Sequence, residues 1–414
     1  MIVPFTGLLV VAAVAFAAPV LAGLIPGRPV PPVVLEVLAG VAVGPQALDL
    51  VRATGAVRLL YLLGFGFLLF LAGQEVEPAR FRGPAFRLSG VTWVASLVLS
   101  VPVAFGLAQI ARGADVRLLA LALTASTLGI VVPVLRDAGE IKTDFGQLAV
   151  VSCSVGEFGS LLLLTILFSA DPEPTGIQVL YVLALGVAAF AGAIGLRRVW
   201  QSAWLRERLL ATDESTAQLR IRGAFVVLLL FSALARQFGV DSLLGAFVAG
   251  IVLRVADTDD RPTQQRYHGK LRAIGYGFLV PVFFIVTGVQ LNVRSLLASP
   301  AALALLPALI LAIAVVRAGP ALLFRRQFGT RRALVAGLLQ ATTLTFPVVV
   351  AEVGQSLDLL TPATAAALLG AALLSVLLFP AVALALRPWT ARDQPRPARP
   401  AGAAGRPAGP DDRT

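Results

Sequence analysis

The stretch Leu123-Thr-Ala-Ser-Thr-Leu128 recurs later in the chain as Leu339-Gln-Ala-Thr-Thr-Leu344. Two more pairs follow the same order: Leu35–Gly40 resembles Gly245–Gly250, and Phe67–Gly73 resembles Val282–Gly288. The members of the three pairs lie 216, 210 and 215 residues apart. Short apolar strings match by chance, but three matches at nearly one spacing predict an internal repeat. The repeat therefore decides how the whole chain is organised.

The composition predicts a polytopic membrane protein. Of the 414 residues, 57% are hydrophobic and only 14% are charged, with a mean hydropathy of +0.86. A soluble domain of this length carries far more charge. We read thirteen apolar stretches of roughly spanning length, near 5–25, 32–48, 56–74, 88–110, 116–135, 145–169, 177–196, 223–238, 241–255, 271–291, 300–323, 333–351 and 361–386.

The repeat predicts an inverted topology. Each copy begins seven spans after its original, and seven is odd, so the second half enters the membrane upside down. Inverted repeats are typical of secondary transporters, whose substrate site lies near the bilayer midplane between the halves. We expect one transmembrane domain over 1–387, with halves at about 31–196 and 223–386. The polar, Pro/Arg-rich segment 388–414 is predicted to be a disordered tail.

The placement of basic residues predicts the orientation. Alternate gaps hold 21 Lys and Arg on one side, and on the other only Arg52, Arg58, Arg112, Arg117, Arg236 and Arg294. The positive-inside rule makes the first side cytoplasmic, with the N-terminus outside and the tail inside. This placement argues against nucleic-acid binding despite the pI of 11.1. The excess of Arg over Lys favours a bacterial cytoplasmic membrane.

Two ionisable residues lie deep in apolar spans, where a charge costs about 2.5–3.5 kcal/mol even on the lenient insertion scale. Glu157 is at the middle of 145–169, so we expect it to carry a proton or a cation; the alternative is a structural buried acid. Arg317 is well inside 300–323. It is either a fixed counter-charge that pairs with Glu157 in the ion-free state, or a side chain that reaches the membrane surface.

Small polar residues mark the two repeated spans. Hydroxyl groups occur at Ser126, Thr127, Thr342 and Thr343, and helix-breaking residues occur at Gly129, Pro133 and Pro347. A proline frees the carbonyl four residues earlier, and hydroxyls beside free carbonyls suit a cation. Such residues also serve ordinary packing in membrane helices. Their presence at matching places favours two discontinuous helices that bind an ion together.

The remaining charged residues receive weaker interpretations. Glu75, Glu77 and Glu352 lie at span ends, where solvated acids are normal, and Glu36 is expected to serve packing or a helix start. His268 is in a basic segment and is expected to be a solvated loop residue, with cytoplasmic pH sensing as the alternative. The sequence has no Walker motif and no cluster of catalytic groups at one membrane face. We therefore expect neither an enzyme nor an ATP-driven pump, and no metal or cofactor.

Four segments resemble monovalent cation:proton antiporters, in the branch that includes the bacterial Kef-type and Nap-type exchangers. The resemblance rests on Pro31–Pro45, Gly66–Glu75, Leu244–Gly250 and Pro281–Gly288. It implies a homodimer of core-and-scaffold subunits in which two broken helices cross beside an ion-binding carboxylate. It also implies an electroneutral-type exchange of Na⁺ or K⁺ for a proton, with a role in pH homeostasis.

The chain departs from the family pattern at two places. The carboxylate is Glu157 rather than an aspartate, and Gly156 replaces the usual polar neighbour. In the second broken helix, Thr342-Thr343-Leu344 stands where Kef-type members have Gly-Glu-Phe. The lost polar neighbour keeps an alternative open, namely a non-transporting or gated ion-sensing protein with the same fold.

The charge count leads to a test of topology. A reporter that fluoresces only in the cytoplasm, fused after Thr414, should give signal, because thirteen spans and the positive-inside rule place that end inside. Fluorescence of intact cells measures this. A dark fusion that is expressed and inserted at normal levels would contradict the thirteen-span topology.

Overall fold

The computed structural model describes residues 5–24, 31–75, 83–168, 175–201, 218–238, 242–257 and 261–386. Glu77, most of the segment that joins the two predicted halves and the predicted tail 388–414 lie outside the described residues. Within them every secondary-structure element is a helix, as predicted. The helices are α1 (Phe5–Leu24), α2 (Pro32–Val43), α3 (Gly55–Glu75), α4 (Pro84–Ile110), α5 (Val116–Ala122), α6 (Leu128–Asp137), α7 (Asp144–Leu167), α8 (Thr175–Gln201), α10 (Leu219–Gln237), α11 (Ser242–Ala256), α12 (Arg261–Ile274), η2 (Gly275–Leu279), α13 (Val280–Gln290), α14 (Val293–Ala298), α15 (Pro300–Ala321), η3 (Leu322–Phe324), α16 (Arg325–Ala341), α17 (Thr345–Ser356) and α18 (Pro362–Ala385).

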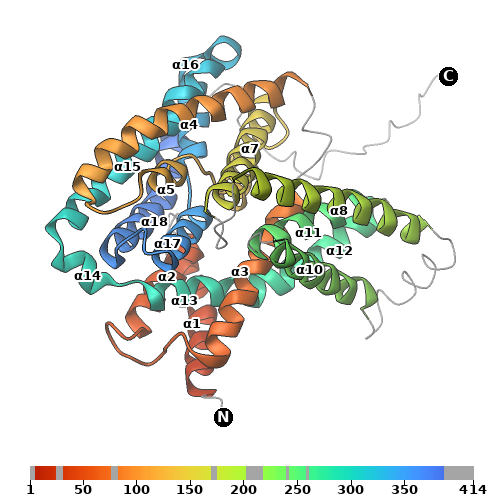
Figure 1. Ribbon diagram of the computed structural model, residues 1–414, viewed down its shortest axis with the longest axis horizontal. Helices are drawn as coiled ribbons and strands as arrows, with labels where there is room; N and C mark the ends of the chain where they lie inside the picture. The colour runs from red at the N-terminus through yellow and green to blue at the C-terminus, as the bar shows by residue number, and fades with distance from the viewer. Residues whose placement is uncertain are drawn as a thin grey trace, which may run out of the picture.

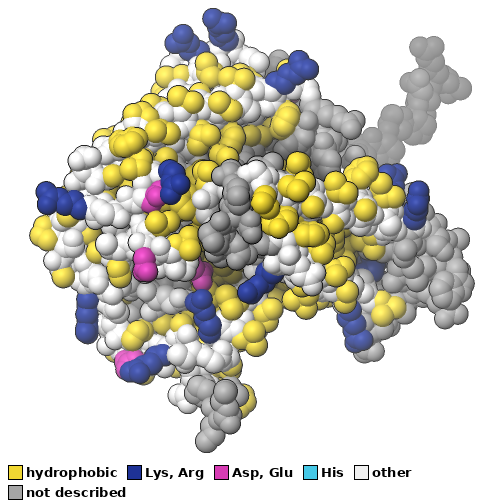
Figure 2. Space-filling model, viewed as in Figure 1, with side chains coloured by type: hydrophobic (Ala, Val, Ile, Leu, Met, Phe, Trp, Pro, Cys, Tyr) yellow, Lys and Arg dark blue, Asp and Glu magenta, His cyan; other side chains and the backbone are white. Residues whose placement is uncertain are grey.

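The helices match the predicted spans in order. In the described part of the chain, eight helical segments are long and apolar enough to cross a membrane, and α2 and α11 are shorter apolar helices. Figure 2 shows apolar side chains over much of the visible surface. Some helices extend past the predicted ends: α12 begins at Arg261 and α16 at Arg325. Polar residues continue these helices beyond the apolar stretch that marks the membrane.

The helices form two bundles; in Figure 1 one occupies the upper left, and the other runs from the lower middle to the right. One bundle, the core, contains α4–α7 and α15–α18; α15 packs on α4, α16 and α18, and α7 packs on α4 and α16. The other bundle, the scaffold, contains α1–α3, α8 and α10–α13; α11 packs on α3, α8 and α10, and α13 packs on α2 and α3. This is the core-and-scaffold division that the sequence resemblance implies.

The scaffold is joined by two glycine crossings, and the first is between α2 and α13. A Cβ atom on Gly40 would collide with the carbonyl oxygen of Ile285, and a Cβ on Gly288 would collide with the carbonyl oxygen of Val37. The two glycine Cα atoms face each other across the contact. Only glycine allows two helix backbones to approach this closely.

The second crossing, between α3 and α11, has the same pattern. A Cβ on Gly250 would meet the carbonyl oxygen of Phe70, and a Cβ on Gly73 would meet that of Phe247. All four residues occupy the places in the repeat that correspond to those of the first crossing. The structure therefore confirms the inverted repeat that the sequence predicts, and the repeated glycines are its contact points.

Both repeated core spans are broken, but not at the predicted residues. The first span is interrupted between Ala122 and Leu128, and the second between Ala341 and Thr345. Pro133 and Gly129 lie inside α6, and Pro347 lies in the first turn of α17. The prediction that these residues break the helices is wrong. A proline in the first turn needs no backbone N–H partner, so Pro347 is compatible with the start of a new helix.

The glycine crossings lead to a stability prediction. Gly40→Ala or Gly250→Ala should lower the free energy of unfolding by about 1–3 kcal/mol, because the new methyl group overpacks a backbone contact. Gly106→Ala on α4 is the matched control, because nothing lies within 4 Å of a Cβ there. Thermal unfolding of the detergent-solubilised protein measures the effect. Equal melting of the three variants would contradict this account.

Candidate functional site

The two breaks cross each other in the middle of the core. The backbone N–H of Thr127 donates to the carbonyl oxygen of Thr342 at 2.9 Å. The hydroxyl of Ser126 donates to the carbonyl oxygen of Gln340 at 2.7 Å. Ser126, Thr342 and Thr343 are fully buried, and Thr127 is 6% exposed. The structure thus brings together the four hydroxyl residues that the sequence singled out.

Each break begins a new helix whose first N–H groups need acceptors. At the start of α17 the acceptor is Thr127, whose hydroxyl oxygen accepts from the N–H of Leu344 at 2.9 Å and of Thr345 at 3.4 Å. At the start of α6 the acceptor is Glu157, whose Oε2 accepts from the N–H of Leu128 at 3.0 Å. A carboxylate at a helix N-terminus is stabilised by the unpaired N–H groups and the helix dipole. Glu157 therefore lies at the positive end of α6.

Arg317 is fully buried and contacts the crossing through Ser126 and Gln340. Its Nη2 donates to the hydroxyl of Ser126 at 2.6 Å, and its Nε donates to the carbonyl oxygen of Gln340 at 3.4 Å. The expected ion pair with Glu157 is absent among the salt bridges of these described residues. The side chain does not reach the membrane surface either. Instead the guanidinium contacts the carbonyl oxygen of Gln340 near the C-terminus of α16, where a positive charge is favourable.

Gly156 leaves the room that Arg317 fills. A Cβ atom at this position would lie 2.7 Å from Nη2 of Arg317 and 3.1 Å from the hydroxyl oxygen of Ser126. Any side chain would therefore displace the guanidinium from Ser126. The departure from the family pattern at this position has a local steric reason, which the sequence alone did not reveal.

Two further polar residues of the crossing received no site role from the sequence, although Gln340 stands in the repeated stretch. Ser375 of α18 accepts from the N–H of Thr343 at 3.1 Å, and its hydroxyl lies 2.8 Å from the carbonyl oxygen of the same residue. The side-chain oxygen of Gln340 accepts from Arg317 at 3.3 Å. Ser375 is a single polar residue in an apolar run, and that was the available signal, whereas Gln340 stands in the repeated stretch Leu339–Leu344 beside two threonines. They satisfy backbone and guanidinium groups that the breaks leave buried.

A cavity connects the crossing to one end of the molecule. It measures about 480 Å³ and is lined by Leu128, whose N–H binds Glu157. Its other lining residues include Arg136, Arg254 and Arg272, so we call this end the arginine-rich end. Glu157 is 7% exposed, against zero for Arg317. The cavity lies between core and scaffold, because α3, α6, α11 and α12 all contribute to it.

The opposite end, which carries Arg58 and Arg236, is called the arginine-poor end. It has two hollows of about 380 and 190 Å³, and Glu352 of α17 lines both. Beside the carboxylate site, the ring of Phe158 stacks on that of Phe247 with centroids 5.4 Å apart. This contact joins core helix α7 to scaffold helix α11. Leu128 lines the cavity at the arginine-rich end and neither of these two hollows.

The acids set aside in the sequence have partners. Glu352 pairs with Arg58 at 3.0 Å, and Glu75 pairs with Arg272 at 3.7 Å. Neither is therefore the freely solvated acid that the sequence predicted. Glu36 is 5% exposed within α2, in agreement with a packing role.

The position of His268 also differs from the prediction. It is not in a loop but in α12, with its Nδ1 3.3 Å from Oε1 of Gln74 and its Nε2 3.7 Å from Asp257. The basic residues around it continue a helix, because α12 extends the following span beyond its apolar part.

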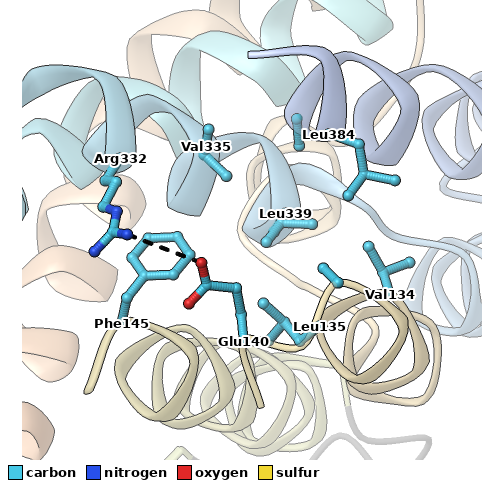
Figure 3. A pocket seen from close by; sticks show the side chains of 10 residues that line it. Val134, Leu135, Glu140, Phe145, Arg332, Val335, Leu339 and Leu384 are labelled. Carbon is cyan, nitrogen blue, oxygen red and sulfur yellow. Dashed lines mark ion pairs between the residues drawn. The ribbon is translucent and has the colours of Figure 1, made fainter. Parts of the chain in front are cut away.

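A much smaller pocket lies at the arginine-rich end of the core (Figure 3). Its volume is about 20 Å³, enough for about one water molecule. Arg332 of α16 points toward Glu140, at 3.9 Å, and over the ring of Phe145 on α7. Glu140 also accepts from the hydroxyl of Thr143 at 2.7 Å. The pocket contains none of the predicted site residues, and these contacts hold the start of α7 against α16.

Comparisons with known proteins agree with this architecture. The sequence profile of the family "Sodium/hydrogen exchanger, transmembrane" matches residues 10–384, and the chain therefore belongs to the sodium/hydrogen exchanger family. The chain is 26% identical over 388 residues to the "Putative Na(+)/H(+) antiporter YjbQ" of Bacillus subtilis, covering 90% of this chain but 61% of that protein. It is 25% identical over 337 residues to the "Probable Na(+)/H(+) antiporter 3" of Methanocaldococcus jannaschii, covering 80% and 84% of the two chains.

A solved structure supports the fold. The sodium proton antiporter MjNhaP1 from Methanocaldococcus jannaschii, at pH 8, superimposes with a TM-score of 0.59, over 92% of this chain and 98% of that chain. The two sequences are 16% identical, so the likeness concerns the fold. It confirms the helical architecture with crossing discontinuous helices.

The contact between Gly156 and Arg317 leads to a double-mutant prediction. Gly156→Ala should destabilise the protein by about 1–3 kcal/mol, because its methyl group overlaps the guanidinium. In an Arg317→Ala background the same change should cost less, since the overlapping atom is gone. Thermal or denaturant unfolding in detergent gives the four stabilities of the cycle. Equal losses in the two backgrounds would contradict the contact.

Proposed function

We propose that this protein is a secondary transporter that exchanges a monovalent cation, Na⁺ or K⁺, for a proton, with Glu157 as the shared binding group. One observation carries the proposal: a buried carboxylate lies at the start of a broken helix and next to a cavity that leads out of the molecule. The names of the relatives, which describe antiporters, support the same activity. The sodium/hydrogen exchanger family gives the class of substrate.

The chemistry of exchange follows from one carboxylate that serves two ligands. A protonated Glu157 has little attraction for a cation, whereas the ionised form attracts one, so proton and cation displace each other. One proton for one cation leaves the charge of the site unchanged, which makes the exchange electroneutral. The low dielectric of the crossing strengthens the attraction of the ionised carboxylate for a proton or a cation.

The crossing residues provide further oxygen ligands. We assign Ser126, Thr127, Thr342 and Thr343 to the cation site together with Glu157. The hydroxyl oxygen of Thr343 is buried and has no hydrogen-bond partner among the described residues, so it is the freest of these ligands. The other three hydroxyls already hold backbone groups. They shape the site more than they enclose the ion.

Arg317 acts as a fixed positive charge in this proposal. It does not release its proton, so it compensates charge without competing as a second carrier. Its contacts to Ser126 and Gln340 place it on the crossing rather than on the carboxylate. Gly156 accommodates this arrangement, so the missing polar neighbour no longer favours the non-transporting, ion-sensing alternative.

Transport requires that the site face each side of the membrane in turn. Here the cavity opens to the arginine-rich end, which we assign to the cytoplasm by the positive-inside rule. We further propose that the scaffold forms the contact of a homodimer, while the core moves relative to it. The setting is the cytoplasmic membrane of a bacterium, with the N-terminus outside. The expected role is pH homeostasis.

Substitution of the carboxylate tests the proposal. Glu157→Gln keeps the size and hydrogen bonding but does not titrate, so cation-driven proton movement should fall to the level of empty liposomes. Glu157→Asp keeps an acid and should retain part of the exchange. Fluorescence dequenching in proteoliposomes, with Na⁺, K⁺ and Li⁺ added separately, measures this.

A second buried glutamate provides the matched control. Glu36→Gln changes an acid that is 5% exposed in another span and should leave exchange near the wild-type rate. Full-rate exchange in the folded Glu157→Gln protein would show that this acid is structural. Equal loss in both variants would point to a general effect of removing a buried charge.

A further inference from the structure

Glu352 is held by two side chains from one scaffold helix. Nη2 of Arg58 on α3 donates to Oε1 of Glu352 at 3.0 Å, and the hydroxyl of Tyr61, one turn along α3, donates to Oε2 at 2.8 Å. Nη1 of Arg58 donates to Oε1 of Gln290 on α13 at 3.1 Å. Arg58 also lies over the ring of Tyr61, 5.1 Å from its centroid. The guanidinium therefore bridges three helices.

These contacts join the two bundles. α3 and α13 belong to the scaffold, whereas α17 belongs to the core. α17 is the second half of a broken helix, and its first residue lies beside Thr127. Any movement of the core away from the scaffold at the arginine-poor end must separate Glu352 from Arg58 and Tyr61. A force on Glu352 acts directly on the helix whose N-terminus forms the crossing.

The surroundings make this contact able to open. Glu352 lines both hollows of the arginine-poor end, so space lies on two sides of it. The side chains of Arg58 and Glu352 are 40% and 30% exposed, which means that water replaces the lost hydrogen bonds when they separate. A part-exposed pair contributes little net stability, so it holds a conformation without locking it permanently.

We propose that Arg58, Tyr61 and Glu352 form a latch that closes the arginine-poor end, and that the latch opens whenever the site turns to that end. The inference rests on the proposed exchange only in that an exchanger must open both ends. The latch itself is a property of the resting protein and is measurable without ion flow.

A buried reporter cysteine measures the opening. Val349 on α17 lines the larger hollow and is 2% exposed, so Val349→Cys becomes reactive when the core leaves the scaffold. The native Cys153 is fully buried and gives a low background. The full-length chain in detergent is reacted with a water-soluble maleimide, and the rate of labelling is followed.

Loss of the latch should expose the reporter. Glu352→Gln and Arg58→Gln should each raise the labelling rate about three- to fivefold, the shift expected for a pair of this exposure. Tyr61→Phe loses only the hydroxyl and keeps its ring stacked on Phe283, so it should give a smaller increase. The charge-exchanged double variant, Arg58→Glu with Glu352→Arg, should return the rate toward that of the parent.

Another arginine of the same end serves as the control. Arg52 pairs with Asp49 at 2.6 Å, but both belong to one loop, so Arg52→Gln should leave the labelling rate unchanged. Unchanged labelling in Glu352→Gln and Arg58→Gln would overturn the latch, and so would equal increases in the single and charge-exchanged variants. Unfolding curves check that each variant is folded. If a charge variant is not folded, the labelling rate of Tyr61→Phe tests the latch in its place. Because labelling needs no ion gradient, this failure is separate from a loss of exchange in Glu157→Gln.

Discussion

The structure depends on one constraint: backbone groups that two helix breaks leave unpaired must be satisfied inside the membrane, where water is scarce. The chain solves this by crossing the breaks, so that each supplies partners to the other. Thr127 accepts from the start of α17 and donates its own N–H to Thr342. Ser375, from a neighbouring span, satisfies the remaining backbone of Thr343. Most polar groups of the crossing are thus held by one another, while the hydroxyl of Thr343 has no hydrogen-bond partner among the described residues.

The same constraint explains where the two deep charges lie. A helix that ends in the membrane has a positive N-terminal end and a negative C-terminal end. Glu157 faces the N-terminus of α6, and Arg317 contacts the carbonyl oxygen of Gln340 near the C-terminus of α16. Each charge is compensated by a helix end rather than by the other charge. Glu157 therefore keeps coordination capacity for a cation or a proton, which a direct pair with Arg317 would consume.

The sequence predicted the fold well because its signals are local or repeated. Span length follows from apolar runs, and the glycines that fix both scaffold crossings stand in the repeated motifs. The proximity of Ser126 to the second repeat followed from the same symmetry. Partners were harder to predict: Arg317 was assigned to Glu157, and the helix breaks were assigned to prolines. Both errors concern which groups are neighbours in space. The position of Arg317 depends on its packing against Gly156, and the helix breaks depend on backbone groups, which carry no sequence signal.

The two bundles differ in how firmly they are built, and this difference has a mechanical consequence. Inside the scaffold, the helices meet backbone to backbone at paired glycines, such as Gly73 and Gly250, which leave no space for sliding. Inside the core, the crossing is fastened by buried hydrogen bonds. Between the bundles, by contrast, lie cavities at both ends, a stacked pair of rings at Phe158 and a part-exposed ion pair at Glu352. A movement that keeps both bundles intact therefore has to occur along this surface between them.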